Sequence, residues 1–268
     1  MNNKAIGVFD SGLGGLTAVK EIINIMENES VVYFGDTGRV PYGSRSEETI
    51  VKYTKQDINF LKQHDIKIIL AACGTASSVA LPVIEQEGIK VIGVVEPTVN
   101  KALSVTKNGK IGIIGTAGTV KSKSYENMLL RKSKDVYVSA KACPLFVPLV
   151  ENGYLTGEIS ELAAREYLQS IVDAGCDTLI LGCTHYPLLK DTINKVTDGK
   201  LTLVDAGKAS AEYLKEYLTD NGLESNTKAE YKYYVSDEGT DFVKIAEMFL
   251  SRKIESISHI DIEKVKVD

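Results

Sequence analysis

Two segments of the sequence recur a little over a hundred residues later, in the same order. The stretch IGVFDSGLGGLT at 6–17 is echoed by IGIIGTAGTVKS at 111–122, at an offset of 105 residues. The stretch IILAACGTASS at 68–78 is echoed by TLILGCTHYPL at 178–188, at an offset of 110 residues. Because the order and the spacing are both kept, the repeat predicts two similar folding units within one chain.

Both units are expected to alternate strands with helices. Short apolar runs rich in β-branched residues lie between helical patterns along the chain. This alternation predicts parallel sheets with helices on both faces, and in such sheets ligands bind at the carboxyl ends of the strands. We therefore expect an α/β fold of two similar doubly wound α/β domains with pseudo-two-fold symmetry and an active site in the cleft between them. The expected strands are 6–9, 31–34, 66–71, 91–95, 110–114, 136–139, 178–181, 201–204 and 231–235.

A boundary between the two domains is expected near Glu96-Pro97, which interrupts the pattern before a helix-like run leads into the second unit. The last strand and helix, from about residue 209, are expected to return to the first unit. The first α/β domain is therefore predicted to span 1–97 plus 209–268, and the second 98–208.

The composition excludes several kinds of partner and site. A hydrophobic fraction of 44% over 268 residues allows real cores, and a net charge of −5 with scattered lysines and arginines gives no footprint for nucleic acid or a membrane surface. No apolar run approaches the roughly 20 residues that span a bilayer, and the amino terminus leads almost directly into the first expected strand, so we expect a cytoplasmic protein. The four cysteines form no C-x-x-C pair and there are three histidines, so we expect no metal site and reduced thiols.

The glycine-rich turn at 9–17 looks suited to an anionic group. It joins an expected strand to an expected helix, where free backbone N–H groups and the helix dipole favour negative charge. The dinucleotide fingerprint fails at Thr17 and the phosphate-loop pattern fails at Leu13, where a glycine and a lysine are required. Asp10 would repel a polyphosphate, so a small ligand that carries both charges fits better. Alternatively, the glycines only allow a tight turn and close helix packing.

Two of the cysteines end strands of the repeat. Cys73 and Cys183 each close an apolar run and precede small hydroxyl residues, a position that can favour a thiolate. A single cysteine there is more often a small core residue, and Cys143 and Cys176 are interpreted as packing residues. The repeat predicts that Cys73 and Cys183 face each other across the cleft. Such a pair suits removal of a proton from one face of a carbon and delivery of another to the opposite face, as in a racemase or epimerase without a cofactor.

Seven motifs spread over most of the first 190 residues extend this prediction. They are FDSGLGGLT (9–17), YFGDTGRVPYGSRS (33–46), AACGTAS (71–77), GVVEPTV (93–99), IGIIGTAGTVKSKSY (111–125), CPLFVPLVENG (143–153) and LILGCTHYPLL (179–189). In kind and order they resemble the glutamate racemases of the aspartate/glutamate racemase superfamily. The resemblance implies an enzyme that interconverts L- and D-glutamate without a cofactor and supplies D-glutamate for peptidoglycan. It also implies a small-molecule substrate as the partner and a homodimer.

The resemblance further implies roles for individual residues. Cys73 and Cys183 would be the two acid/base thiols, while Asp10, Glu151 and His185 would assist their proton transfers. The implied substrate contacts are Asp10, Ser11, Pro41, Tyr42, Gly43, Ser44, Gly74, Thr75, Thr116, Thr119, Thr184 and His185.

One position departs from the family pattern. The family usually has asparagine directly after the first cysteine, where this chain has Gly74. Loss of the amide removes one side-chain hydrogen bond to the substrate, although the backbone N–H of glycine remains. We therefore expect activity to survive, with weaker binding or an altered substrate orientation.

Some alternatives stay open from the sequence. Asp36 is expected to cap its turn or to support Tyr42, and Arg39 and Arg45 are expected either to bind a substrate carboxylate or to be solvated. The substrate could be another small acidic amino acid such as aspartate. The chain could also be a binding protein that closes on a ligand without chemistry, but a pure binder gains nothing from two readily oxidised thiols.

Overall fold

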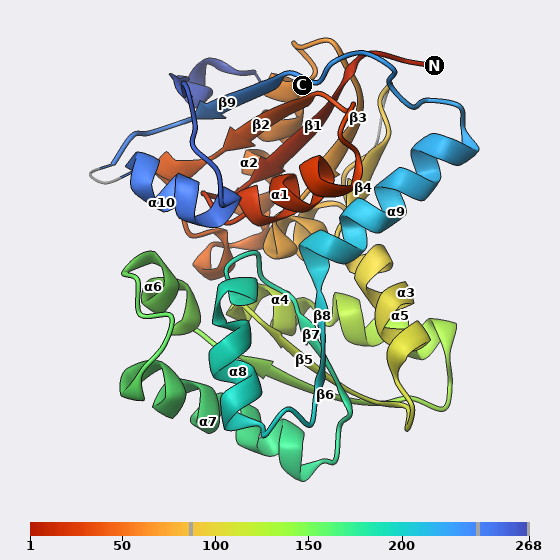
Figure 1. Ribbon diagram of the computed structural model, residues 1–268, viewed down its shortest axis with the longest axis vertical. Helices are drawn as coiled ribbons and strands as arrows, with labels where there is room; N and C mark the ends of the chain where they lie inside the picture. The colour runs from red at the N-terminus through yellow and green to blue at the C-terminus, as the bar shows by residue number, and fades with distance from the viewer. Residues whose placement is uncertain (86–87, 240–241, 267–268) are drawn as a thin grey trace.

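The chain folds around two separate parallel sheets, as seen in a computed structural model that describes residues 1–85, 88–239 and 242–266. Figure 1 shows the sheets in two lobes stacked along the long axis of the molecule. The first sheet has the order β10 (Ser258–His259), β9 (Tyr231–Val235), β2 (Val31–Gly35), β1 (Ala5–Asp10), β3 (Ile66–Ala71) and β4 (Val91–Gly93). The second has the order β6 (Tyr137–Ala142), β5 (Lys110–Gly115), β7 (Thr178–Leu181) and β8 (Thr202–Asp205).

The sequence repeat corresponds to equivalent places in the two sheets. The order β2-β1-β3-β4 in the first sheet matches β6-β5-β7-β8 in the second, and every pairing between these strands is parallel. The echoed segments contain β1 and β5 in one case, and β3 and β7 in the other. The prediction of an α/β fold with two similar parallel-sheet domains is therefore confirmed.

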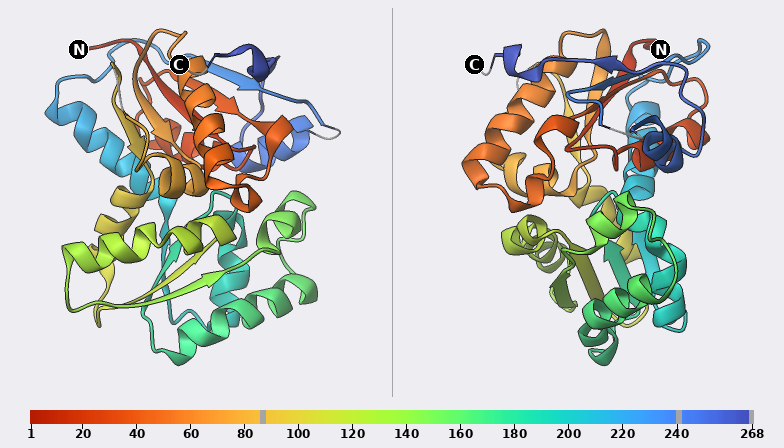
Figure 2. Two further views of the ribbon diagram at one scale, coloured as in Figure 1. Left: turned by 180° about the vertical axis from the view of Figure 1, so that it is seen from behind. Right: turned by 90° about the vertical axis from the view of Figure 1, so that its left-hand side faces the viewer.

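Helices cover both faces of the first sheet because its strands are apolar on both sides. Along β1, Ile6 and Val8 belong to one buried cluster, whereas Ala5 and Phe9 belong to another, as expected when side chains alternate between faces. The turned views in Figure 2 show α1, α9 and α10 on one face and α2 on the other. The helices are α1 (Leu16–Ile25), α2 (Glu47–Leu61), α3 (Val95–Val105), α4 (Ala117–Ser122), α5 (Ser124–Lys132), α6 (Phe146–Glu151), α7 (Glu158–Asp173), α8 (Lys190–Val196), α9 (Ala206–Asp220) and α10 (Phe242–Leu250).

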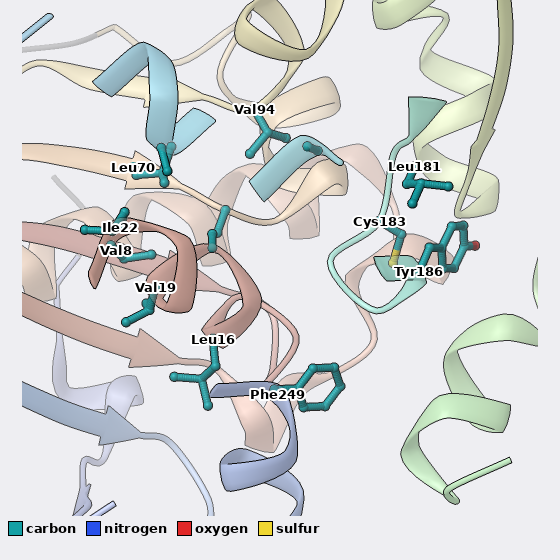
Figure 3. Packing of buried hydrophobic residues seen from close by; sticks show 14 of the residues in the cluster. Val8, Leu16, Val19, Ile22, Leu70, Val94, Leu181, Cys183, Tyr186 and Phe249 are labelled. Atoms are coloured by element: carbon teal, nitrogen blue, oxygen red, sulfur yellow. The ribbon is translucent and has the colours of Figure 1, made fainter. Parts of the chain in front are cut away.

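The largest buried cluster continues from one domain into the other. Leu16 and Leu70 of the first domain and Leu181, Cys183 and Tyr186 of the second belong to the same cluster. Figure 3 shows this packing, with Phe249 of α10 beside the segment that carries Cys183 and Tyr186. The carboxyl ends of the two sheets therefore meet through packed side chains.

Some element boundaries differ from the expected ones. The strand expected at 91–95 ends at Gly93, because the Val94 N–H donates to the Ser77 hydroxyl at 3.1 Å and α3 begins at Val95. The strand β10 was not expected, and its two residues pair with the end of β9. The predicted boundaries at 97/98 and 208/209 fall within α3 and α9, and division of the chain at those points stays a prediction.

Across the described ranges, no helix combines the length and the apolar character needed to cross a membrane.

Candidate active site

Two thiols lie at the carboxyl ends of equivalent strands. Cys73 follows β3 after one residue, and Cys183 follows β7 after one residue. Both side chains are buried, with exposed fractions of 4% and 8%. In each domain this edge of the sheet faces the other domain, as the packing in Figure 3 shows for the segment with Cys183.

Cys73 lies in an environment that favours the neutral thiol. Its sulfur donates to the Ser11 hydroxyl at 3.4 Å and accepts from the Ala76 N–H at 3.5 Å. Burial, followed by the charge of Asp10, raises the pKa of the Cys73 thiol to about 12, and the contacts with Ser11 and Ala76 oppose this only in part. At neutral pH Cys73 therefore carries its proton.

Cys183 has a cationic neighbour instead. His185 Nδ1 lies 3.9 Å from Cys183 Sγ, and His185 Nε2 lies 3.0 Å from Glu151 Oε1. Burial alone would lower the pKa of His185, but the contacts with Cys183 and Glu151 outweigh burial and raise the pKa to about 10. The imidazole is therefore protonated at neutral pH, and the Phe249 ring packs edge-on against it at 5.1 Å between centroids.

Asp10 lies between these two environments. Its carboxylate accepts from the Gly12 N–H at 3.1 Å, and the Thr184 hydroxyl of the second domain lies 3.5 Å from its other oxygen. Burial raises the pKa of Asp10, while the charge of His185 and the backbone N–H groups of the glycine turn limit the rise. A single buried carboxyl group thus acts electrostatically on both Cys73 and His185.

Hydroxyl groups join the loops of the two domains. The Thr75 and Thr116 hydroxyls lie 2.9 Å apart, and Thr116 lies 3.0 Å from the Thr119 hydroxyl. The Thr17 hydroxyl donates to the Thr184 carbonyl at 3.1 Å. These hydrogen bonds bring loops that are distant in sequence together at the junction of the domains. Two of the threonines, Thr75 and Thr184, lie within two residues of the thiols in the chain.

The Tyr42 side chain is directed into the first domain. Its hydroxyl lies 2.5 Å from Asp36 Oδ2 and 2.9 Å from Asp57 Oδ2, and all three residues are buried. Arg39 donates to Asp36 at 2.7 Å and to Asp57 at 3.3 Å, and its guanidinium lies 4.0 Å from the centre of the Tyr53 ring. Asp36 therefore supports Tyr42 and does not cap the helical turn at 37–39 with its side chain, and Arg39 is occupied by these two acidic side chains.

The segment after Tyr42 lines a cavity of about 330 Å³ at the junction of the domains. Gly43 and Ser44 contribute from the first domain, and Thr116 and Glu151 contribute from the second. The complete lining is Val40, Pro41, Gly43, Ser44, Thr116, Ala117, Cys143, Pro144, Val147, Pro148 and Glu151. This lining includes no lysine or arginine among the described residues, so an anionic ligand would be held there by hydroxyl and backbone N–H groups.

The arrangement matches a known family. The model of the family described as Asp/Glu/Hydantoin racemase matches residues 6–214. The chain belongs to the Asp/Glu/Hydantoin racemase family. Its members include the glutamate racemase of Geobacter metallireducens, which is 43% identical over 266 residues, covering 98% of each chain.

Solved structures of racemases have the same fold. The glutamate racemase of Francisella tularensis, crystallised with D-glutamate, is similar with a TM-score of 0.92 and 36% identity, covering 98% of this chain and 99% of that one. The aspartate racemase of Picrophilus torridus is similar with a TM-score of 0.57 at 19% identity, covering 82% of this chain and 94% of that one, which shows a shared fold alone.

Sequence reasoning missed two residues that contact members of the candidate site, Asp57 beside Tyr42 and Phe249 beside His185. Asp57 was detectable, because it lies on the buried stripe of α2 with Ile50, Thr54 and Leu61, where an unpaired carboxylate would be costly. Phe249 gave no comparable signal, because an apolar residue in an amphipathic helix predicts only a core position.

The structure also locates the other cysteines. Cys143 and Cys176 are both buried, and Cys143 lines the cavity between the domains. Among the residues that the structure describes, no three histidine, cysteine or acidic side chains are grouped so that they could hold a metal ion.

Proposed function

We propose that this protein is a cofactor-independent glutamate racemase that interconverts L- and D-glutamate and supplies D-glutamate for peptidoglycan. The observation that carries the proposal is the pair of buried thiols at the ends of equivalent strands, each with its own ionisable neighbour. Membership of the racemase family and the similarity to glutamate racemases over nearly the whole chain support it.

In the proposed reaction, two sulfur atoms act on opposite faces of the α-carbon. The thiolate of one cysteine takes the α-proton, and the electron pair of the broken C–H bond moves onto the α-carboxylate of the substrate. The thiol of the other cysteine then protonates the carbon from the opposite face and becomes a thiolate. One turnover exchanges the protonation states of the two sulfurs, so the reaction needs no oxidant or reductant.

The environments of the thiols suit these two roles. Cys73 is a neutral thiol at neutral pH and therefore begins as the acid. The imidazolium of His185 lies beside Cys183. Its Nε2 atom is hydrogen-bonded to the Glu151 carboxylate. We assign Asp10, Glu151 and His185 to assist the proton transfers.

The substrate carboxylates require stabilisation from neutral groups. Charge that develops on the α-carboxylate is best stabilised by donors fixed in advance, and the loops offer backbone N–H and hydroxyl groups. Tyr42 would take part through its backbone, because its hydroxyl is held by Asp36 and Asp57. The remaining proposed contacts are Asp10, Ser11, Pro41, Gly43, Ser44, Gly74, Thr75, Thr116, Thr119, Thr184 and His185.

The remaining parts of the proposal concern assembly and location. We assign residues 1–97 plus 209–268 to one domain and 98–208 to the other. We also infer a homodimer in the cytoplasm, with glutamate as the small-molecule partner and with neither nucleic acid nor a membrane as a partner.

The proposal is tested by incubating the protein with L-glutamate in deuterated water while following optical rotation and the α-proton signal. The wild type is expected to invert and exchange the α-carbon, whereas Cys73→Ala and Cys183→Ala are each expected to abolish racemisation. Cys176→Ala removes a buried thiol outside the site and is expected to keep activity. Full racemisation by either of the first two variants excludes the two-base mechanism, and faster turnover of L-aspartate than of L-glutamate selects the aspartate alternative.

A further inference from the structure

Gly74 and Gly182 touch across the two domains, directly beside the thiols. Gly74 follows Cys73 in the chain, and Gly182 precedes Cys183. A Cβ atom built on Gly74 would lie 2.2 Å from the carbonyl oxygen of Gly182 and 3.2 Å from its carbonyl carbon. Real Cβ atoms essentially never approach another atom closer than 3.0 Å, so in this arrangement only glycine fits at position 74.

This contact is much tighter than another backbone approach between the domains, where a Cβ on Gly118 would lie 3.1 Å from the Gly43 carbonyl oxygen, and it differs in kind from two further approaches. A Cβ on Gly14 would meet the Thr184 hydroxyl at 2.3 Å, and one on Gly43 would meet Thr116 Cβ at 2.7 Å. Those neighbours are side-chain atoms, and Thr184 Oγ1 can move by rotation about χ1. At Gly74 the neighbour is backbone, which has no rotamer to change.

Both backbones at the contact are fixed by their own sheets. The Gly182 N–H donates to the Ile114 carbonyl of β5 at 2.8 Å, which continues the ladder of the second sheet. On the other side, the Ala72 N–H donates to the Phe9 carbonyl of β1 at 2.9 Å, which continues the ladder of the first sheet. A side chain at position 74 can therefore be accommodated only by moving one domain relative to the other.

We propose that Gly74 is a positioning residue, whose missing side chain lets the two thiol-bearing segments reach backbone contact and so sets the separation of the two sulfurs. The inference rests on the proposed racemase function, because the spacing of the sulfurs matters only if both act on one carbon. An added methyl group would need the domains to separate by about 1 Å to reach ordinary contact, and a misplacement of that size can cost about 100-fold in rate.

The proposal reverses the expected effect of an asparagine at this position. From the sequence alone, Gly74→Asn would restore a missing substrate contact and tighten binding. In the structure the Asn side chain has to pass through the Gly182 carbonyl, so Gly74→Asn is expected to lower the turnover number as Gly74→Ala does, without any gain in affinity.

The kinetic test compares Gly74→Ala with Gly239→Ala, since a Cβ on Gly239 meets no heavy atom of the described residues within 4 Å. Gly74→Ala is expected to lower kcat for L-glutamate about 10- to 100-fold, with KM changed much less, because the reacting groups are misplaced while the binding loops remain. In deuterated water, exchange of the α-proton without inversion is expected to rise relative to racemisation, since a single thiol can still take and return a proton. Gly239→Ala is expected to behave as wild type in both measurements.

Alkylation of the thiols provides a readout that does not depend on activity. Cys73 and Cys183 are buried at the junction, so iodoacetamide is expected to label both several-fold faster in Gly74→Ala, as measured by peptide mass mapping. Cys176, buried elsewhere, serves as the internal reference and is expected to keep its wild-type rate. If Cys176 accelerates equally, the variant has lost its fold and the inference of a domain contact is wrong.

Wild-type kcat together with wild-type labelling in Gly74→Ala overturns the inference. Failure of the proposed function looks different, because then the wild type itself does not racemise glutamate. The labelling rates still report on the Gly74–Gly182 contact in that case.

Discussion

His185 bridges Cys183 and Glu151, with Nδ1 3.9 Å from the sulfur and Nε2 3.0 Å from the carboxylate. The imidazole is almost fully buried, whereas the Glu151 side chain is 39% exposed. The buried imidazolium of His185 is therefore connected to the solvent through its hydrogen-bond partner Glu151. The ionisable neighbour of Cys73, Asp10, is instead buried.

Removal of the Glu151 charge is expected to lower the pKa of His185. Glu151→Gln keeps the size of the side chain but loses the carboxylate that helps to raise this pKa to about 10. We expect the pKa of His185 to fall by at least about 1 unit and the proposed racemase activity at neutral pH to fall about 10-fold. Nitrogen-15 NMR of the imidazole, titrated from pH 6 to 11, measures the first effect directly. An unchanged pKa in the glutamine variant contradicts the assignment of Glu151.

The same histidine is expected to make stability depend on alkaline pH. Its folded pKa of about 10 lies above the ordinary value of 6.5, so the folded state holds the proton more tightly than the unfolded state. The stabilisation is therefore complete below about pH 6.5 and is lost as the pH rises through about 10. Between these limits the single group contributes a decline of about 1.4 kcal/mol per pH unit. Urea unfolding of the wild type and of His185→Gln at pH 7, 8 and 9 is expected to show a steeper decline in the wild type.

The Asp57 carboxyl is expected to work in its protonated form. Burial, followed by the charge of Asp36, raises the pKa of Asp57 well above its usual range. A phenol has one proton, and the shorter contact of Tyr42 is with Asp36, so Asp57 is assigned as the donor to the Tyr42 oxygen.

An amide can replace that protonated carboxyl. Asp57→Asn is expected to change the free energy of unfolding by less than about 1 kcal/mol, because the amide can still donate to Tyr42 and accept from Arg39. Asp57→Ala removes one contact from Tyr42 and one from Arg39, which both keep Asp36, and leaves a buried cavity, so it is expected to cost about 2–3 kcal/mol. Denaturant unfolding at pH 7 compares the two variants, and equal losses would contradict a protonated Asp57.

Phe249 is expected to support the imidazole of His185 as well as the core. The ring is 1% exposed and contacts His185 edge-on. Phe249→Ala removes this wall and is expected to destabilise the fold by about 3–5 kcal/mol, whereas Phe249→Leu keeps most of the apolar volume and is expected to cost less than half as much. Thermal unfolding ranks the variants. The alanine variant also removes the edge-on aromatic contact of the imidazole.

The sequence was sufficient to predict the paired sheets, because the repeat and the buried, β-branched strands both depend on local pattern. Cys73 and Cys183 were placed at strand ends by the same reasoning, since an apolar run that stops at a cysteine marks the edge of a sheet. The side chain of Tyr42 was not predictable in this way. Its direction depends on Asp57, which is brought beside it only when α2 packs against the first sheet.

The Gly74 contact was also beyond prediction from local pattern. Sequence reasoning compared the glycine with the asparagine of its family and considered only a lost hydrogen bond. The space that a side chain needs at this position is taken by Gly182, which lies in the other domain and far away in the sequence. Such a contact depends on how the two folded domains pack against each other. The residues near Gly74 in the sequence do not indicate that packing.

The second sheet is connected to the first by two segments, which contain α3 and α9, and these helices pack against each other between the lobes (Figure 1). A joint with one connection can swivel as well as bend. Two connections lying side by side resist torsion, so we expect rocking about one axis to be the easiest motion of the second lobe. Such rocking would bring the opposing loops together along nearly the same arc each time, so that the reactive groups meet in the same relative position.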